Sequence, residues 1–595
     1  MRFLRPFTVR SLGGLLLLLM SVYHPVAAQQ PSESSSMQRI ADRALRKFAP
    51  SEHKARWNDG LGILLAGVDA AWYDTANGRY YEFILRSVDS FVASDGTIAE
   101  DVRQMGPCSR ALFGRQVLLL YRVTQEKKYY LASKALQDEL TDPVAGGALS
   151  AQAEAPGPAF CPVEPFLAEY ASVFQEPQDR RKITRQLLLN AQSVQETAGN
   201  ADRNANTAAS SSPSRLAASI TALVDTLPYD PGNDPGRAQL LTVLKRMAAA
   251  VIRDQDSHSG LWPRSLPQQA ADHNDDSTMA CLFTYALARG VRLGYLPRTD
   301  LAGAERAWRS IRNREQPSDN GTTVPGTDGA GSEPATAGAF LLAASEMTLQ
   351  PRAMDGLGKK VLLDAWYNSQ RRENAAGQSE LFHYKWDDQS NSGFSLLGHI
   401  FRSDGMMTST LASAPTLAKL RDAQYYLIAS PDNTVKNPHP HFMNAADAEP
   451  IAAWVRSGGV LLIMENDPAN ADIPHMDILA DRFGLHFNNV LVHHVIGDRF
   501  EMGRIEVPSP ALPFTHPHVL YMKDTCSLKL SKAARPLLQW KGDTLMAIAK
   551  YGKGTVLAVT DPWLYNEYTD GRNLPAEYDN FAAGVELIHW LLRQR

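Results

Sequence analysis

The sequence has little of what marks a nucleic-acid-binding or metal-binding protein. Its 595 residues carry a net charge of −4, and no long run of Lys or Arg occurs, so binding to a phosphate backbone has no electrostatic support. Only four cysteines are present, and they lie far apart without the spacing of metal ligands: Cys108, Cys161, Cys281 and Cys526. We therefore predict no nucleic-acid partner, no metal and no cofactor.

A long apolar run is also missing beyond the first 30 residues, so no membrane partner is expected for the mature chain. The chain begins with arginines, an apolar stretch too short to span a bilayer, and small residues before Gln29. This pattern predicts a signal peptide over residues 1–28. No cysteine sits at the cleavage point, which argues against a lipoprotein. We expect a periplasmic or secreted protein, in which a Cys108–Cys161 disulfide is possible. The sequence leaves the oligomeric state open.

A sequence pattern occurs twice in the first half of the chain. "DTANGRYYEFILRSVDSFV" and "VTQEKKYYLASKALQDEL" each place a Thr before a basic residue and a Tyr pair, and each follows an apolar helix. The two threonines, Thr75 and Thr124, are 49 positions apart. A repeated helical hairpin, with further amphipathic helices behind it, predicts an (α/α) barrel over residues 37–350. Residues 194–215, rich in Ala, Asn and Ser, read as a flexible insertion.

The pattern changes after Pro351. Apolar strands such as "VLLIMEND" alternate with amphipathic helices such as "AEPIAAWVRSGG", which predicts a three-layer α/β domain with a mainly parallel sheet over residues 361–595. The phrases "HYKWDDQSNSGFSLLGHIF" and "VTDPWLYNEYTDGRNLPAEYDNF" resemble the flavodoxin-like domains of class I glutamine amidotransferases. No cysteine follows "VLLIMEND", where an enzyme of that type would carry its nucleophile. The phrase "TDPWLYNEYTDGR" follows a strand end, so we favour a docking or glycan-binding loop there.

Several phrases of the helical half resemble the unsaturated rhamnogalacturonyl hydrolases of glycoside hydrolase family 105 and the related family 88. They include "GRQVLLLYRVTQEKKY", "VEPFLAEYASVF", "SGLWPRSL" and "DDSTMACLFTYALARGVRLGYL". The resemblance implies an (α/α)6 barrel. It also implies a uronic-acid-containing oligosaccharide as partner, from which a terminal 4,5-unsaturated uronic acid is removed. In this family an aspartic acid protonates the enol-ether double bond, water adds, and the hemiketal falls apart.

The chain departs from the family at both active-site aspartates. The acid/base position falls on Pro158 in "PAFCPVEPF", and the second aspartate falls on Ser109 in "GPCSRALFGR". Neither side chain can transfer a proton as a carboxylic acid does, and the loss of a general acid costs roughly 10²–10⁴ in rate. We therefore expect a glycosidase with a relocated acid, or a catalytically inactive glycan-binding homologue.

Two acidic residues are candidate replacements for the catalytic acid. Asp276 matches an acidic position of the family, although capping of the following helix explains it equally well. Glu164 lies just before "PFLAEYASVF", where stabilisation of the first helical turn is the simpler interpretation. Aromatic and cationic residues of the expected cleft are predicted to bind substrate: Trp57, Trp262, Arg264 and His273. In the second half, Asp432, His439 and His441 have only weak metal-site spacing.

Overall fold

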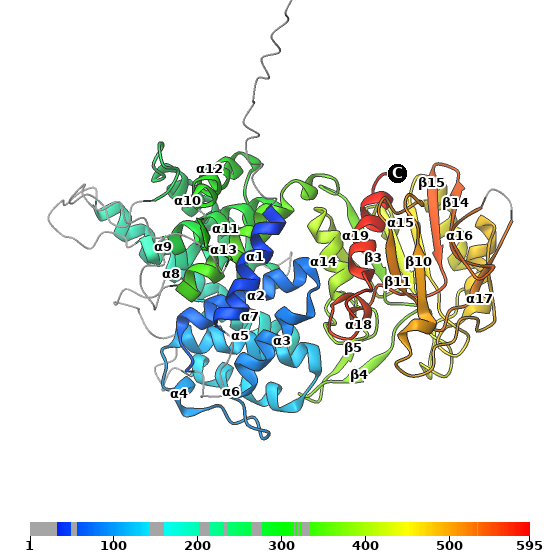
Figure 1. Cartoon of the computed structure of the whole chain (residues 1–595), viewed down its shortest axis with the longest axis horizontal. Helices are drawn as coiled ribbons and strands as arrows, with labels where there is room; N and C mark the ends of the chain where they lie inside the picture. The colour runs from blue at the N-terminus through cyan, green and yellow to red at the C-terminus, as the bar shows by residue number, and fades with distance from the viewer. Residues whose placement is uncertain are drawn as a thin grey trace, which may run out of the picture.

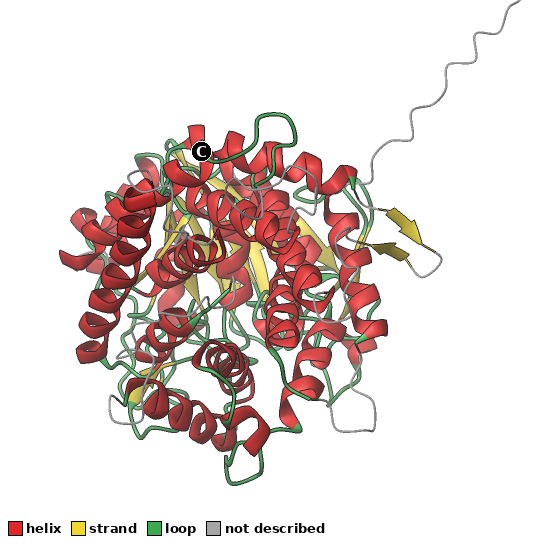
Figure 2. Ribbon diagram, turned by 90° about the vertical axis from the view of Figure 1, so that its left-hand side faces the viewer, coloured by secondary structure: helices red, strands yellow, loops and turns green. Residues whose placement is uncertain are grey.

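The computed structural model describes residues 33–48, 56–142, 160–201, 213–230, 235–262, 277–314, 316–318, 321–323, 333–531 and 534–594. These residues form a helical half and a half built on a β-sheet, which lie side by side (Figure 1). Seen from the helical side, the sheet lies behind the helices (Figure 2). None of the described helices combines the length and the apolar character that a membrane span requires.

The helical half is a closed double ring. Six inner helices pack each against the next, and the last closes on the first. They are α2 (Asp59–Thr75), α5 (Pro107–Thr124), α7 (Val163–Val173), α9 (Pro213–Thr226), α11 (Ser277–Arg292) and α13 (Glu333–Leu349). Six outer helices alternate with them along the chain: α1 (Glu33–Lys47), α3 (Gly78–Asp89), α6 (Lys127–Thr141), α8 (Pro177–Ala201), α10 (Pro235–Arg253) and α12 (Leu301–Asn313). The predicted (α/α)6 barrel is confirmed.

The turn that repeats in the sequence repeats in the structure. Thr75 ends α2, and its hydroxyl donates to the carbonyl of Ala71 and accepts from the amide of Asn77. Thr124 ends α5 and makes the same pair of hydrogen bonds, to the Leu120 carbonyl and from the Glu126 amide. In both turns the next residue has a positive φ, of 52° and 61°. The Thr side chain therefore caps each inner helix and directs the chain into an outer helix.

Small residues close the ring between α2 and α13. A Cβ added at Gly67 would lie 2.4 Å from the carbonyl oxygen of Gly338, and one added at Gly338 would lie 2.2 Å from the carbonyl oxygen of Ile63. The two backbones therefore approach as closely as only glycine permits. This contact is the closure point of the barrel, because α13 is its last helix and α2 its first inner one.

Gly338→Ala is expected to lower the free energy of unfolding by about 1–3 kcal/mol, because the new methyl group meets backbone atoms that cannot move aside. Gly106→Ala is the matched control, since a Cβ there has no atom within 4 Å. Urea unfolding followed by far-UV circular dichroism measures both. Equal midpoints for the two variants would contradict the close contact.

The structure describes only part of the flexible insertion that the sequence predicts over residues 194–215. Helix α8 extends to Ala201, so the chain is helical well into the predicted insertion. Residues 202–212 lie outside the described residues.

The second half is built on a nine-stranded sheet. Its order is β6-β3-β7-β8-β15-β14-β12-β9, with β13 paired to β14, and the first five strands are parallel. The strands are β3 (Lys360–Asp364), β6 (Met407–Leu411), β7 (Tyr425–Ala429), β8 (Val460–Met464), β9 (Leu485–Asn488), β12 (Ser527–Leu530), β13 (Arg535–Trp540), β14 (Asp543–Tyr551) and β15 (Gly554–Val559). Short hairpins lie outside it: β1 (Gln316–Ser318) with β2 (Gly321–Thr323), β4 (Arg371–Glu373) with β5 (Ser379–Leu381), and β10 (Arg504–Val507) with β11 (His518–Tyr521).

Helices cover both faces of this sheet. Alternate residues of the buried strands belong to two different apolar clusters, as the period of two in a strand requires. Helices α14 (Ser395–Ser403) and α19 (Asn580–Leu591) cover one face, and α16 (Ala445–Arg456) and α17 (Ile473–Ala480) cover the other. Short helices complete the chain: α4 (Glu100–Arg103), α15 (Leu417–Leu420) and α18 (Asn566–Thr569). The predicted three-layer α/β domain is confirmed.

The sheet domain packs against the carboxyl ends of the inner helices. Asp74, at the end of α2, lies 2.9 Å from His399 Nε2 on α14. The indole of Trp72 donates to the carbonyl of Asp570 at 2.8 Å, and Arg122, near the end of α5, donates to the carbonyl of Asp387. The amino ends of the inner helices therefore form the opposite end of the barrel, which we call the mouth.

Candidate active site

The mouth of the barrel is held by a disulfide. Cys108, in the first turn of α5, is bonded to Cys161, just before α7, with a Cα–Cα distance of 4.7 Å. The bond fixes the starts of two neighbouring inner helices relative to each other. The sequence left this pairing open, and the structure confirms it.

Replacing both cysteines by alanine is expected to lower the free energy of unfolding by roughly 2–4 kcal/mol, because the bond closes a long loop of the unfolded chain. The cysteines are 53 residues apart. Thermal unfolding with and without a thiol reductant measures the effect. The wild type should lose stability in reductant and the double variant should not respond to it. A wild type that is indifferent to reductant would overturn the prediction.

Ser109, where the sequence predicted the loss of an active-site aspartate, has a structural partner. Its side chain is 4% exposed, and its Oγ accepts a hydrogen bond from Trp57 Nε1 at 3.2 Å. The Trp57 ring is itself buried and packs edge-on against Phe113, with centroids 4.9 Å apart. Ser109 therefore has a packing role, because its hydroxyl fixes the buried indole of Trp57. It does not supply a proton for catalysis. Pro158, at the other aspartate position, lies outside the described residues.

The other predicted site residues fall into two groups. Asp276, Arg264 and His273 lie outside the described residues. Trp262 is 4% exposed, packs on Phe283 and donates its indole N–H to the Val251 carbonyl at 2.7 Å. Trp262 and Trp57 are thus buried and packed against other rings, and their predicted contact with sugar stays a prediction.

Glu164 is buried between an inner and an outer helix. Its Oε1 accepts a hydrogen bond from Asn190 Nδ2 of α8 at 2.6 Å. Burial raises the pKa of its carboxyl, and the hydrogen bond from Asn190 opposes that rise. Since its partner belongs to the outer ring, Glu164 links α7 to α8, and the structure does not place it with the polar groups of the barrel interior.

Those polar groups form a charged cluster along the barrel axis. Arg115 of α5 lies 3.1 Å from Asp225 of α9, although α5 and α9 are not neighbours in the ring, so this pair crosses the interior. Arg289 joins Asp225 to Glu346 of α13, at 3.2 and 3.0 Å. Further members complete it: Arg122, Glu169, Tyr285 and Arg292. We call this set the axial cluster.

Asp69 is the carboxyl of this interior that has no hydrogen-bonded partner for its buried Oδ1 among the described residues. It lies past the middle of α2 and interacts electrostatically with Arg115, Glu169 and Arg122 of two other inner helices, so it faces the axis. Burial raises the pKa of Asp69 to about 7, against the opposing effect of the two arginines. The residue as a whole is partly exposed, although its Oδ1 is buried. Asp69 is thus an acid that titrates near neutral pH inside the barrel.

The comparison with protein families decides the identity of the helical half. The model of Glycosyl Hydrolase Family 88 matches residues 32–348, which is more than half of the chain. The chain belongs to glycosyl hydrolase family 88. The resemblance drawn from the sequence phrases is therefore confirmed, and the matched range ends where α13 ends.

Solved structures with a similar helical half include a family 105 glycoside hydrolase from C. acetobutylicum, 22% identical, with a TM-score of 0.42, covering 52% of this chain and 98% of that one. A family 88 protein from Bacteroides vulgatus is 17% identical, with a TM-score of 0.41, covering 53% and 99%. The unsaturated glucuronyl hydrolase of Bacillus sp. GL1 is 15% identical, with a TM-score of 0.36, covering 53% and 95%.

Sequence reasoning about this family 88 chain missed Asp69. The residue stands in the apolar run "GILLAGVDAAWYD", and a charge among buried inner-helix residues was the available signal. Its neighbours on the axis come from helices far apart in the sequence, so no local spacing reveals the cluster. Knowing which helices form the inner ring would have pointed to Asp69, since a charge there must face the interior.

Metal-ligating groups are sparse in the part of the chain that the structure describes. One set of three side chains there has suitable spacing, Asp477, Asp481 and His486, and it lies in the sheet domain. Asp432, considered with two histidines from its spacing, instead accepts hydrogen bonds from Gln370 and Asn437. The family 88 barrel shows no such group among its described residues.

Proposed function

We propose that this family 88 protein is an exported hydrolase that removes unsaturated uronic acid from the ends of oligosaccharides left by polysaccharide lyases. Family membership supports the reaction class. The apolar amino terminus with its small residues before Gln29 supports export. The reaction adds one water molecule across the ring double bond, after protonation of one of its carbons, and the resulting hemiketal opens to release the remaining sugar.

The observation that carries this proposal is Asp69, an acid inside the barrel with a pKa of about 7. Such a group is substantially protonated at neutral pH, so it can give a proton to the double bond and then take one from the attacking water. Arg115 and Arg122 favour its charged form. They therefore stabilise the carboxylate left after proton donation. We assign the acid to Asp69 in place of Ser109 and Pro158, and this assignment moves the acid along the barrel axis, because Asp69 lies in the carboxyl half of α2 and Ser109 in the first turn of α5.

The test is an absorbance assay with unsaturated disaccharides prepared by a polysaccharide lyase. The double bond absorbs in the ultraviolet, and its absorbance is expected to decay when the purified mature protein is added. No decay at any pH, together with saturable binding of the same disaccharides, would replace the hydrolase with a glycan-binding protein. The serine at position 109 in place of a family aspartate is the observation that favours this second function.

Glu164→Gln should leave the rate of this reaction within about twofold of wild type, because a glutamine can still pair with Asn190 and the group takes no part in proton transfer. Steady-state kinetics on the unsaturated disaccharide measure it. A loss of a hundredfold or more would move the acid from Asp69 to Glu164. Asp276→Asn, measured in the same way, tests the remaining acid predicted from the sequence.

A further inference from the structure

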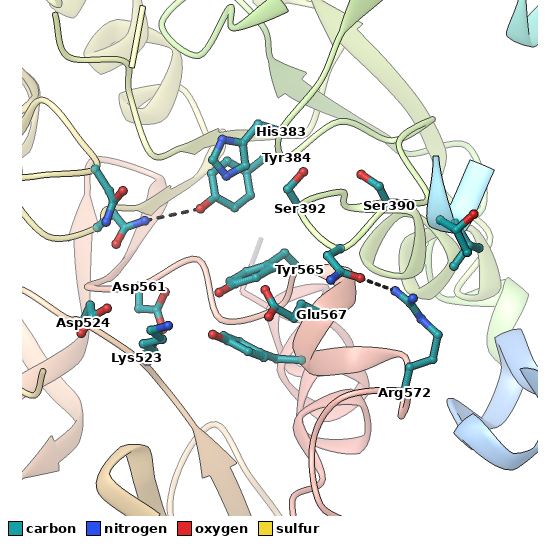
Figure 3. A pocket seen from close by; sticks show the side chains of 16 residues that line it. His383, Tyr384, Ser390, Ser392, Lys523, Asp524, Asp561, Tyr565, Glu567 and Arg572 are labelled. Atoms are coloured by element: carbon teal, nitrogen blue, oxygen red, sulfur yellow. Dashed lines mark hydrogen bonds between the residues drawn. The ribbon is translucent and has the colours of Figure 1, made fainter. Parts of the chain in front are cut away.

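A pocket of about 540 Å3 opens at the carboxyl edge of the sheet (Figure 3). Its walls come from the segments after β5, β8, β11 and β15, and the barrel contributes only Val123 and Thr124 at the end of α5. Its volume lies within the range of small-molecule sites. Loops after the carboxyl ends of parallel strands are also where α/β domains hold their ligands.

The backbone around this pocket is strained. His383 and Tyr384 are consecutive residues with positive φ, of 64° and 55°, and Asp524 on the opposite wall has a φ of 54°. Side chains disfavour this conformation, so three such residues around one cavity persist only where the surrounding structure enforces them. Backbone strain of this kind is found at ligand sites more often than elsewhere in proteins.

Three ionisable side chains face this pocket without a full set of partners. Asp561 is 2% exposed; its Oδ2 accepts a hydrogen bond from the amide of Lys523 at 3.0 Å, and its Oδ1 has no partner among the described residues. The Lys523 ammonium and the Glu567 carboxylate likewise have no side-chain hydrogen bond or ion pair within the described parts of the chain. Figure 3 shows Lys523 beside Asp561, and Glu567 beside Tyr565. A ligand with its own donors and acceptors would supply the hydrogen bonds that these three groups lack.

Aromatic rings form the remaining wall. Tyr384 and Tyr565 meet edge to face, with centroids 5.8 Å apart, and Tyr568 packs against Tyr565 at 4.6 Å. The hydroxyl of Tyr384 is held by Asn466 Nδ2 at 3.4 Å. Tyr565 is partly exposed, whereas Tyr384 and Tyr568 are buried behind it. Tyr565 thus gives the pocket an apolar ring surface beside its polar groups, which suits a ligand with C–H faces and hydroxyl edges.

We propose that this pocket binds a neutral saccharide, at a site separate from the barrel. Sugar hydroxyls both donate and accept, so they can meet Asp561, Glu567 and Lys523 together, while the tyrosines cover the C–H face of the ring. Burial raises the pKa of Asp561 to about 8, so at neutral pH it is largely uncharged and offers a donor as well as an acceptor. A uronic acid would meet the carboxylates of Glu567 and Asp524 as well as the ammonium of Lys523, and this excess of negative groups in the lining disfavours it.

The experiment measures binding of glucose, galactose, rhamnose and maltose to the full chain by saturation-transfer NMR and calorimetry, with glucuronic acid as the charged comparison. Asp561→Asn and Tyr565→Ala should weaken binding of the neutral sugar at least about tenfold. Asp422→Asn is the matched control, because its side chain is 73% exposed and lies before β7, at the opposite edge of the sheet. If Asp561→Asn or Tyr565→Ala fails to fold, Lys523→Met replaces it, because Lys523 is partly exposed. This variant should also weaken binding of the neutral sugar.

Saturable binding of at least one neutral sugar, weakened in the pocket variants and unchanged in Asp422→Asn, supports the proposal. Absence of saturable binding across the panel overturns it, as does binding that the pocket variants leave unchanged. Preferential binding of glucuronic acid through the same residues overturns the neutral class. The assay needs no hydrolysis, so its outcome is independent of the reaction proposed for the barrel.

Discussion

Asp69→Asn is expected to lower kcat/KM for an unsaturated disaccharide by at least a hundredfold, since an amide cannot donate the proton that the double bond needs. Asp138→Asn is the matched control, because that aspartate pairs with Lys134 on the outer face of α6 with 59% of its side chain exposed. Steady-state kinetics on both variants test the assignment. Equal rates for Asp69→Asn and wild type would remove Asp69 from the mechanism.

The same variant separates catalysis from a purely structural role. Folding raises the pKa of Asp69 from 3.8 to about 7, so its favourable contribution to stability is present below pH about 4 and is lost as the pH rises through 7. Asparagine carries no charge to bury. Asp69→Asn should therefore be more stable than wild type at pH about 9 and little changed at pH about 4 in urea unfolding, because the penalty grows between the unfolded pKa of 3.8 and the folded pKa of about 7. If Asp69 had only a structural role, Asp69→Asn would show this stability pattern without any loss of catalytic rate.

Glu346→Gln is expected to lower the free energy of unfolding by about 3–5 kcal/mol. The carboxylate is buried and accepts hydrogen bonds from Arg292 at 2.6 and 2.7 Å and from Arg289 at 3.0 Å. Glutamine has nearly the same shape but removes the negative charge that Arg292 pairs with, and it leaves Arg289 with Asp225 alone. The loss should appear as a lower urea midpoint.

Glu82→Gln provides the control for this prediction. Glu82 pairs with Arg86 one turn away on the exposed face of α3, so its loss should cost no more than about 0.5 kcal/mol. Burial opposes the ionised form of Glu346, but Arg292 and Arg289 outweigh it and hold the pKa of that carboxyl below its ordinary value. Its contribution is therefore present at neutral pH and lost as the pH falls below about 4. Equal effects of the two substitutions would contradict the buried network.

Much of the fold could be predicted because its signals are local. The repeated Thr-Tyr-Tyr pattern predicts a capped turn, which Thr75 and Thr124 form in the same way. The alternation of apolar strands with amphipathic helices predicts the sheet domain. The closure of the ring of inner helices could not be predicted from local sequence signals. It depends on the contact between Gly67 and Gly338, residues from opposite ends of the barrel sequence.

The candidate site was harder to predict because its groups come from separate helices. Trp57 and Trp262 looked like sugar-stacking residues, but a tryptophan beside a turn fills a core equally well, and both rings are buried. Glu164 was chosen for its place next to a family motif, yet its partner on α8 directs it away from the axis. Asp69 has no motif around it. Its role follows only from the side of α2 on which it lies.

The pH dependence of kcat/KM on a lyase-generated unsaturated disaccharide tests the central claim most directly. If Asp69 is the acid, the rate should be constant at low pH and fall with a single ionisation near pH 7, and Asp69→Asn should remove both the rate and that ionisation. The claim is contradicted if the wild type hydrolyses the disaccharide with no ionisation near neutrality, or if it shows no hydrolysis at any pH.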